Sequence, residues 1–253
     1  MEEILRAEHI TKSYEGRIII EDISLHLQRR ELVCLLGVSG AGKTTLFHIL
    51  SGLVSPDGGR VFLSGEDITG RPGRISYMLQ KDLLLPYKKI IDNVSLPLVI
   101  KGAGKKDARL KARAYFDQFG LADTEDKYPA QLSGGMRQRA ALLRTYLSSD
   151  GAALLDEPFS ALDTITKNAI HTWYLDVMSR IDLATLFITH DIDEAVMLSD
   201  RIYILSGKPG RITNELVISE KKPRSPDFLL TPEFLEYKRK ILGMLGPSDF
   251  TAK

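Results

Sequence analysis

The sequence offers little that would tie it to an oxidising compartment or to the interior of a bilayer. It holds a single cysteine, Cys34, in 253 residues, so it has no internal disulfide, which fits a reducing cytosol. Cys34 lies in an apolar run, where we expect it to be packed rather than reactive. No apolar run reaches the about 20 residues that a membrane-spanning helix needs, and residues 1–8 are too acidic for a secretory signal. We therefore expect a soluble chain that reaches a membrane only through a partner.

An excess of charge of either sign is also missing. The 34 Lys and Arg residues nearly balance the 33 Asp and Glu residues, which gives a net charge of +1. So weak a long-range field gives no reason to expect nucleic acid or an anionic bilayer as a partner, although a balanced total can still contain a local basic face. With 43% hydrophobic residues, the chain can bury a sizeable core in one or two domains.

The apolar residues form short runs of the length of a strand. Four continuous runs occupy residues 33–36, 152–155, 186–189 and 202–205. Continuous rather than alternating apolar character favours strands that are covered on both faces, as in a parallel sheet. Helical segments follow three of these runs, which is the βαβ order of an α/β protein. Segments 5–10, 18–20, 23–27 and 61–63 alternate more, and this pattern predicts an antiparallel flank.

The middle and the end of the chain have a helical composition. Residues 91–149 are predicted to form an inserted helical subdomain, with an exposed basic linker at 101–106. One predicted helix has an apolar stripe that consists of Ala108, Ala112, Phe116 and Phe119. Residues 221–226 are basic, contain proline and are expected to be a second linker. Thr231 and Pro232 then predict a helix start, and the stripe that follows consists of Phe234, Lys238, Ile241 and Leu245. This helix is expected to pack on its own domain, and the alternative is a tail that binds a partner.

Residues 37–44 match the Walker A pattern between a predicted strand and a predicted helix. Glycines let successive backbone N–H groups turn inward around an anion, and the N-terminus of the helix adds a positive dipole end. Lys43 is expected to reach the β- and γ-phosphates, and the Thr44 hydroxyl to ligate Mg²⁺. The predicted phosphate-binding residues are Gly37, Ser39, Gly40, Ala41, Gly42, Lys43, Thr44 and Thr45. This motif alone does not distinguish a kinase, a GTPase, a helicase and a transporter ATPase.

A second part of the site is predicted at the end of the apolar run 152–155. Two adjacent carboxylates, Asp156 and Glu157, follow this run directly. Asp156 has the position of a Walker B aspartate, whose oxygen atoms hold Mg²⁺ directly or through water. Glu157 is expected to point toward the γ-phosphate and to polarise the attacking water.

Residues 132–139, with the sequence LSGGMRQR, resemble the signature motif of the ABC ATPase family. Ser133, Gly134 and Gly135 would form a second anion site at a helix N-terminus. A chain with two such sites, of which only one has a lysine, is consistent with two copies that close on one nucleotide. Many members of the family have Gln at the fifth position of this motif, where this sequence has Met136. The serine and glycines that contact phosphate are intact, so only fine-tuning by that glutamine is in question.

Four further elements occur in the family's order, and the resemblance extends from Tyr14 to about Arg211. It implies that Tyr14 stacks on adenine and that Gln80 contacts Mg²⁺ and water. It also implies that Asp163, in a loop at residues 160–163, crosses a dimer interface and that His190 contacts the γ-phosphate. The implied fold is a P-loop NTPase core of a mainly parallel sheet and flanking helices, with an antiparallel β flank and an inserted α-helical subdomain. The expected boundaries are 1–220 for the ATPase domain, with a core at about 1–90 and 150–220, and 221–253 for a C-terminal extension.

The resemblance implies an ATPase that binds ATP and Mg²⁺ as a homodimer on two integral membrane permease subunits. An extracytoplasmic solute-binding protein would be an indirect partner, and the chain would lie peripherally on the cytoplasmic face of the membrane. Segments 85–94, 158–163, 189–195 and 206–212 look like those of importers in the nitrate, sulfonate and taurine group, which implies a small anionic or heterocyclic solute. Two alternatives are a soluble ABC ATPase of DNA repair or translation and an ATP clamp that dimerises without turnover.

Overall fold

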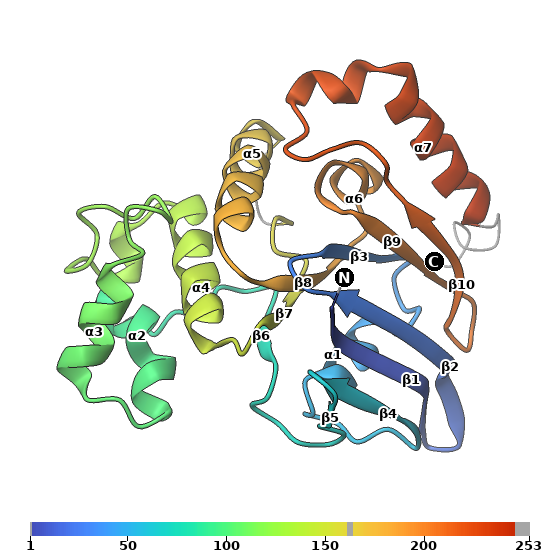
Figure 1. The fold of residues 1–253 in the computed structure, drawn as a ribbon, viewed down its shortest axis with the longest axis horizontal. Helices are drawn as coiled ribbons and strands as arrows, with labels where there is room; N and C mark the ends of the chain where they lie inside the picture. Colours follow the sequence, from blue (N-terminus) through green and yellow to red (C-terminus); the bar gives the residue numbers. More distant parts are fainter. Residues whose placement is uncertain (1, 161–163, 246–253) are drawn as a thin grey trace.

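A mainly parallel six-stranded sheet forms the centre of the molecule (Figure 1). The computed structural model describes residues 2–160 and 164–245. From edge to edge the strands are β10 (Arg211–Val217), β9 (Arg201–Ser206), β3 (Leu32–Gly37), β8 (Ala184–Thr189), β7 (Ala152–Asp156) and β6 (Ser76–Met78). Only the pairing of β10 with β9 is antiparallel within this described sheet. The α/β class and the four strands predicted from continuous apolar runs are confirmed.

The strand β3 shows why those runs are continuous. Side chains alternate between the two faces of a strand. Leu32, Cys34 and Leu36 enter a hydrophobic cluster on one face of the sheet, while Val33 and Leu35 enter a second cluster on the other. Both faces are therefore covered, as in other parallel sheets. Cys34 is fully buried, and burial raises the pKa of its thiol well above the usual value, which agrees with the prediction that it is packed.

An antiparallel sheet flanks this core, as the alternating segments predict. Its order is β2 (Arg17–Gln28), β1 (Glu3–Tyr14), β4 (Gly58–Leu63) and β5 (Glu66–Asp67). The predicted segments 18–20 and 23–27 belong to one long strand, because β2 continues to pair with β1 through a series of irregular steps in register. Helix α1 (Lys43–Leu50) buries its apolar side chains in the hydrophobic cluster that both sheets share.

Three helices form the inserted subdomain on the left of Figure 1: α2 (Ile90–Ile100), α3 (Lys105–Arg113) and α4 (Gly134–Ser148), with a short 3-10 turn η1 (Pro129–Gln131) before α4. The predicted apolar stripe is buried, but the helix that carries it ends at Arg113, so Phe116 and Phe119 lie in turns. Phe119 instead packs against Tyr146 of α4 and Trp173 of α5 (Thr164–Arg180). Tertiary packing thus holds this segment outside a helix.

The C-terminal segment lies on the core rather than apart from it. In residues 221–226, the predicted linker, Arg224 is buried and donates hydrogen bonds to the carbonyl oxygens of Val196, Met197 and Ser199. These carbonyl groups lie at the C-terminal end of α6 (Ile192–Leu198). The last carbonyl groups of a helix have no hydrogen-bond donor within the helix itself. After η2 (Pro226–Leu230), helix α7 (Pro232–Met244) begins with the predicted cap, since the Thr231 hydroxyl accepts a hydrogen bond from the N–H of Phe234. Among the described helices, none has the length and apolar character needed to cross a bilayer.

Two adjacent residues of α7 test this packing. Phe234 is 2% exposed and packs edge-on against Phe228, whereas Leu235 is 48% exposed on the same helix. Phe234→Ala should lower the free energy of unfolding by about 3 kcal/mol, whereas Leu235→Ala should change it by less than about 0.5 kcal/mol. Urea denaturation followed by circular dichroism measures both. Equal effects of the two substitutions would contradict the docked position of α7.

Candidate nucleotide-binding site

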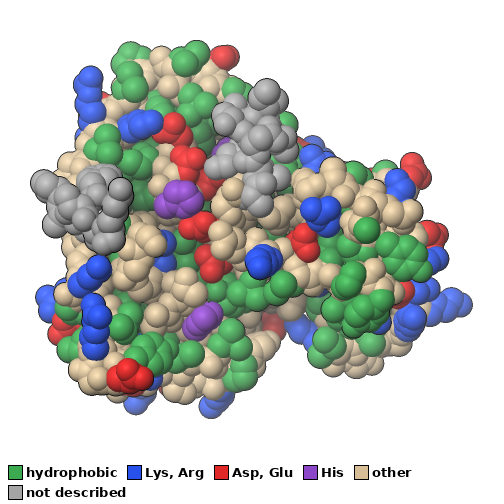
Figure 2. All heavy atoms as spheres, turned by 180° about the vertical axis from the view of Figure 1, so that it is seen from behind, with side chains coloured by type: hydrophobic (Ala, Val, Ile, Leu, Met, Phe, Trp, Pro, Cys, Tyr) green, Lys and Arg blue, Asp and Glu red, His purple; other side chains and the backbone are tan. Residues whose placement is uncertain are grey.

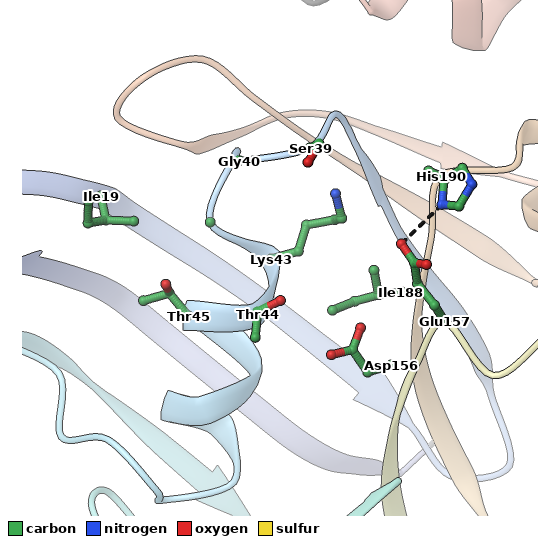
Figure 3. A pocket seen from close by; sticks show the side chains of 11 residues that line it. Ile19, Ser39, Gly40, Lys43, Thr44, Thr45, Asp156, Glu157, Ile188 and His190 are labelled. Atoms are coloured by element: carbon green, nitrogen blue, oxygen red, sulfur yellow. Dashed lines mark hydrogen bonds and ion pairs between the residues drawn. The ribbon is translucent and has the colours of Figure 1, made fainter. Parts of the chain in front are cut away.

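Three neighbouring parallel strands bring the predicted motifs together. The Walker A loop follows β3, Glu157 follows β7, and His190 follows β8, which lies between those two strands. The register pairs Leu36 with Thr189 and Asp156 with Ile188, so all three strands end at the same edge of the sheet. A cavity of about 590 Å³ opens there (Figure 3). It is lined by Ile19, Ser39, Gly40, Gly42, Lys43, Thr44, Thr45, Asp156, Glu157, Ile188 and His190.

The Walker A loop has the backbone of an anion cradle. Gly40 and Gly42 have φ values of 81° and 96°, in the left-handed region that favours glycine. A Cβ atom on Gly42 would also lie 2.4 Å from a methyl carbon of Ile20, so the close approach to β2 excludes a side chain. Gly42 is the N-cap of α1, and no side chain caps that helix. Its first N–H groups and its dipole therefore favour an anion in the cavity.

Lys43 lies at the base of this loop with its ammonium group held by the backbone. Its Nζ donates hydrogen bonds to the carbonyl oxygens of Gly37 and Val38, at 2.7 and 2.8 Å. Burial lowers the pKa of Lys43, and the nearby carboxylates of Glu157 and Asp156 oppose that shift. The ammonium group thus lies close to both carboxylates, and the phosphates of a nucleotide would add further negative charge beside it.

Asp156 is partly buried at the end of β7. Burial raises the pKa of its carboxyl group, and a hydrogen bond of 3.2 Å from the Tyr77 hydroxyl works against that rise. Tyr77 lies on β6, beside β7 in the sheet. This tyrosine was not predicted from the sequence, because no motif surrounds it and its role depends on the pairing of β6 with β7.

The side chains of Gln80 and His190, from two separate loops, meet at Glu157. Gln80 Nε2 donates a hydrogen bond to Glu157 Oε2 at 3.1 Å, and His190 Nδ1 lies 3.0 Å from Glu157 Oε1. Figure 3 shows the His190 ring and the Glu157 carboxylate side by side at the rim of the cavity. Glu157 has a φ of 44°, which is uncommon for a residue with a side chain. Such strain is frequent at functional sites, where neighbouring structure holds the residue in place.

The oxygen donors of the cavity fit a hard divalent cation that is bound together with phosphate. The described residues contain no group of three or more His, Cys, Asp or Glu side chains arranged to hold a metal ion. The Thr44 hydroxyl and the Asp156 carboxylate line the same cavity, and Mg²⁺ prefers one or two such ligands together with substrate phosphates and water. The amide of Gln80 donates a hydrogen bond to Glu157, which lines this cavity.

The signature segment lies elsewhere. None of the described residues that line the 590 Å³ cavity belongs to it. Ser133 is the N-cap of α4, where its hydroxyl accepts a hydrogen bond from the N–H of Met136. Gly134 lines a neighbouring groove of about 800 Å³ together with Gln80, Glu157 and His190. The predicted second anion site, at Ser133, Gly134 and Gly135, therefore does not line the phosphate cradle of its own chain.

The remaining predicted residues have varied positions. Tyr14 is 46% exposed at the end of β1 and does not line the described cavity, whereas Ile19 and Ile188 line it and were not predicted. Gly37 and Ala41 belong to the loop but do not line the described cavity. Ala41 is buried, and a Cβ on Gly37 would lie 2.3 Å from the carbonyl oxygen of Leu205. Asp163 lies outside the described residues.

The raised pKa of Asp156 leads to a stability prediction. Because the folded state disfavours the carboxylate, stability contributed by this group rises as the pH falls through its folded pKa. Asp156→Asn, which keeps an acceptor for Tyr77, should therefore raise the free energy of unfolding of the nucleotide-free protein at pH 7.5. The difference from the wild type should shrink toward pH 4. Urea denaturation at both pH values measures it, and a loss of stability at pH 7.5 would contradict the assigned cause.

Comparisons with known proteins agree with this geometry. Residues 20–160 match the family model described as ABC transporter. The formylaminopyrimidine import ATP-binding protein ThiZ of Halalkalibacterium halodurans is 41% identical, over 96% of this chain and 94% of its own length. The nitrate import ATP-binding protein NrtD of Synechocystis is 36% identical, over 90% of this chain and 88% of its own length.

A solved structure gives the same result for the fold. The dimeric ATP-binding cassette MJ0796, in a post-hydrolysis state with ADP and phosphate bound, is 25% identical with a TM-score of 0.72. The match covers 86% of this chain and all of that one. The predicted P-loop NTPase fold and ATPase class are thereby confirmed. The chain belongs to the ABC transporter family, as an ATP-binding subunit with ATPase activity.

Proposed function

We propose that this chain drives a membrane importer by binding and hydrolysing ATP between two of its copies. The observation that carries the proposal is the meeting of Lys43, Glu157 and His190 at the ends of three adjacent strands. A cavity with a phosphate cradle on one side and a hydrogen-bonded carboxylate on the other suits hydrolysis of a phosphoanhydride.

The position of Ser133 supports a dimer. Its helix N-terminus is a second anion site, and it borders a groove next to the cradle rather than the cradle itself. A second copy of the chain, related by a two-fold axis, would bring its own Ser133 to the first copy's nucleotide, and the reverse. The γ-phosphate then joins the two copies, because only a triphosphate presents charge to both anion sites.

In the proposed reaction Glu157 accepts a hydrogen bond from water and orients it for in-line attack on the γ-phosphorus. The bond from the γ-phosphorus to the bridging oxygen breaks, and ADP and phosphate are formed. Gln80 and His190 hold the Glu157 carboxylate from two sides, and His190 also donates to the developing negative charge. Mg²⁺, which Thr44, Asp156 and Gln80 would hold, neutralises phosphate charge when it is bound.

The surface beside Gln80 supports coupling to a membrane partner. Leu83 is 52% exposed and Tyr87 72% exposed, whereas Leu84 between them is buried in the core. In Figure 2 apolar side chains gather on the lobe formed by the inserted helices. A permease subunit that covers these side chains would sense movements of the loop that contains Gln80, and the chain would then lie on the cytoplasmic face of the membrane.

The relatives support the expected class of solute. The names of ThiZ and NrtD specify import of formylaminopyrimidine and nitrate. We infer a small anionic or heterocyclic solute for this chain as well, bound outside the cell by a separate protein. These names also favour import over a soluble role in DNA repair or translation.

Replacement of the proposed water-orienting group tests the chemistry. Glu157→Gln should slow ATP turnover at least about 100-fold, because the uncharged amide is a poor acceptor for the proton of water. ATP affinity should be retained, and ATP should trap the variant as a dimer. Phosphate release, nucleotide binding and light scattering measure these three outcomes. Glu233→Gln, on the exposed face of α7, is the control and should behave as the wild type. Turnover at the wild-type rate in Glu157→Gln would refute the assignment.

Mixing two inactive variants tests the dimer. Lys43→Ala and Ser133→Arg should each abolish turnover, because each damages both sites of a homodimer. In a mixed dimer, one site combines the intact Lys43 of one copy with the intact Ser133 of the other. The mixture should therefore regain up to about a quarter of wild-type activity, given random exchange in a two-fold dimer.

A second mixture is the control. Lys43 and Glu157 belong to the same half of a site, so mixing Lys43→Ala with Glu157→Gln should restore nothing. If neither mixture regained activity although mixed dimers formed, each nucleotide would lie within one copy and the proposed arrangement would be wrong.

A further inference from the structure

We propose that Thr189 and Glu194 are positioning residues that hold the backbone of His190 where hydrolysis needs it. This inference rests on the proposed role of His190. It concerns a buried network next to the histidine that links β8, α6 and α5.

Thr189 precedes His190 and forms a hydrogen bond with the residue that follows it. It is the last residue of β8 and is 2% exposed. Its hydroxyl donates a hydrogen bond of 2.5 Å to Glu194 Oε2 and accepts one of 3.1 Å from the backbone N–H of Asp191. The residues before and after His190 are therefore joined through one hydroxyl group. This closed turn restricts the backbone dihedral angles of the histidine between them.

Glu194 anchors that turn to the rest of the protein. Its side chain lies on α6 and is only 2% exposed. A buried carboxylate requires hydrogen-bonding partners, and its second oxygen, Oε1, lies 3.3 Å from Nε2 of His171 on α5. The Asp191 side chain caps α6 by accepting hydrogen bonds from the N–H groups of Asp193 and Glu194. The strand that ends at the histidine and the helix that begins after it are thus fixed to each other.

The same network also contacts the segment that follows Glu157. The His171 ring packs edge-on against Phe159, with 5.0 Å between ring centroids. Phe159 is buried and follows Glu157 by two residues. One buried cluster therefore supports the main chain of both members of the Glu157–His190 pair, whose side chains meet at 3.0 Å.

The exposure of these groups indicates why the support acts through the backbone. The His190 side chain is 64% exposed, so packing restricts its ring only weakly. Glu194 and Thr189 are not among the described residues that line the cavity. Their most direct connection to the cavity is through His190, which follows Thr189 in the chain, and a displacement of about 1 Å in a catalytic group can cost about 100-fold in rate.

A matched pair at Thr189 separates positioning from general stability. Thr189→Val keeps the shape of the side chain and removes both hydrogen bonds, whereas Thr189→Ser keeps the hydroxyl. In the otherwise unmodified full chain, Thr189→Val should lower kcat about 10- to 100-fold with KM for ATP changed less than about twofold. Thr189→Ser should stay within about threefold of the wild-type kcat. Glu194→Met should resemble Thr189→Val, because it keeps the length of the side chain and removes both oxygen atoms.

The His190→Ala background gives the decisive comparison. If Thr189 acts through His190, adding Thr189→Val to His190→Ala should lower the single-turnover rate less than about twofold further, since coupled residues are not additive. Independent effects that multiply would overturn the inference, and so would a wild-type kcat in Thr189→Val. Thermal melting of each variant distinguishes unfolding from loss of positioning. If Glu157→Gln is inactive while Thr189→Val is not, this inference fails alone and the proposed hydrolysis stands.

Discussion

The parallel pairing of β3, β8 and β7 is the constraint on which the site depends. Parallel strands end at one edge, so the residues that follow them lie near one another whatever their separation in sequence. The Walker A loop, His190 and Glu157 are brought together in this way, with β8 as the middle strand. Both faces of the three strands are buried in hydrophobic clusters. The same three buried strands therefore form the core that stabilises the fold and align the loops that follow them.

This burial explains which features the sequence could predict. A strand that is buried on both faces must be apolar throughout, so residues 33–36, 152–155, 186–189 and 202–205 were recognisable, and the functional loops followed directly. Ile19 and Tyr77 could not be recognised in the same way. Ile19 of β2 lines the cavity, and Tyr77 of β6 donates a hydrogen bond to Asp156. Their roles depend on which strands are neighbours, and no local pattern encodes that arrangement.

The prediction of a helix that includes Phe116 and Phe119 was wrong for the same reason. Phe116 and Phe119 have the apolar spacing of a helix and are buried as predicted, but residues 114–120 form turns, in which Phe119 packs against Tyr146 and Trp173. Segment 221–226 has the basic, proline-containing composition of a linker, and that composition did not predict that Arg224 donates hydrogen bonds to carbonyl oxygens at the end of α6. In both segments, a distant part of the chain supplies the partner that decides the conformation.

The site also shows a conflict between stability and function. Lys43 is buried with a lowered pKa, Asp156 has a raised pKa, and Glu157 has a strained backbone. Each feature disfavours the folded protein, and the phosphates of a bound nucleotide would favour the charged form of Lys43. Such a site needs rigid surroundings. Lys238 of α7 pairs with Asp193 at 2.6 Å near the start of α6, and Arg224 binds the end of that helix. The C-terminal segment thus supports the short helix that directly follows His190, so its packing and the geometry of the site are physically linked.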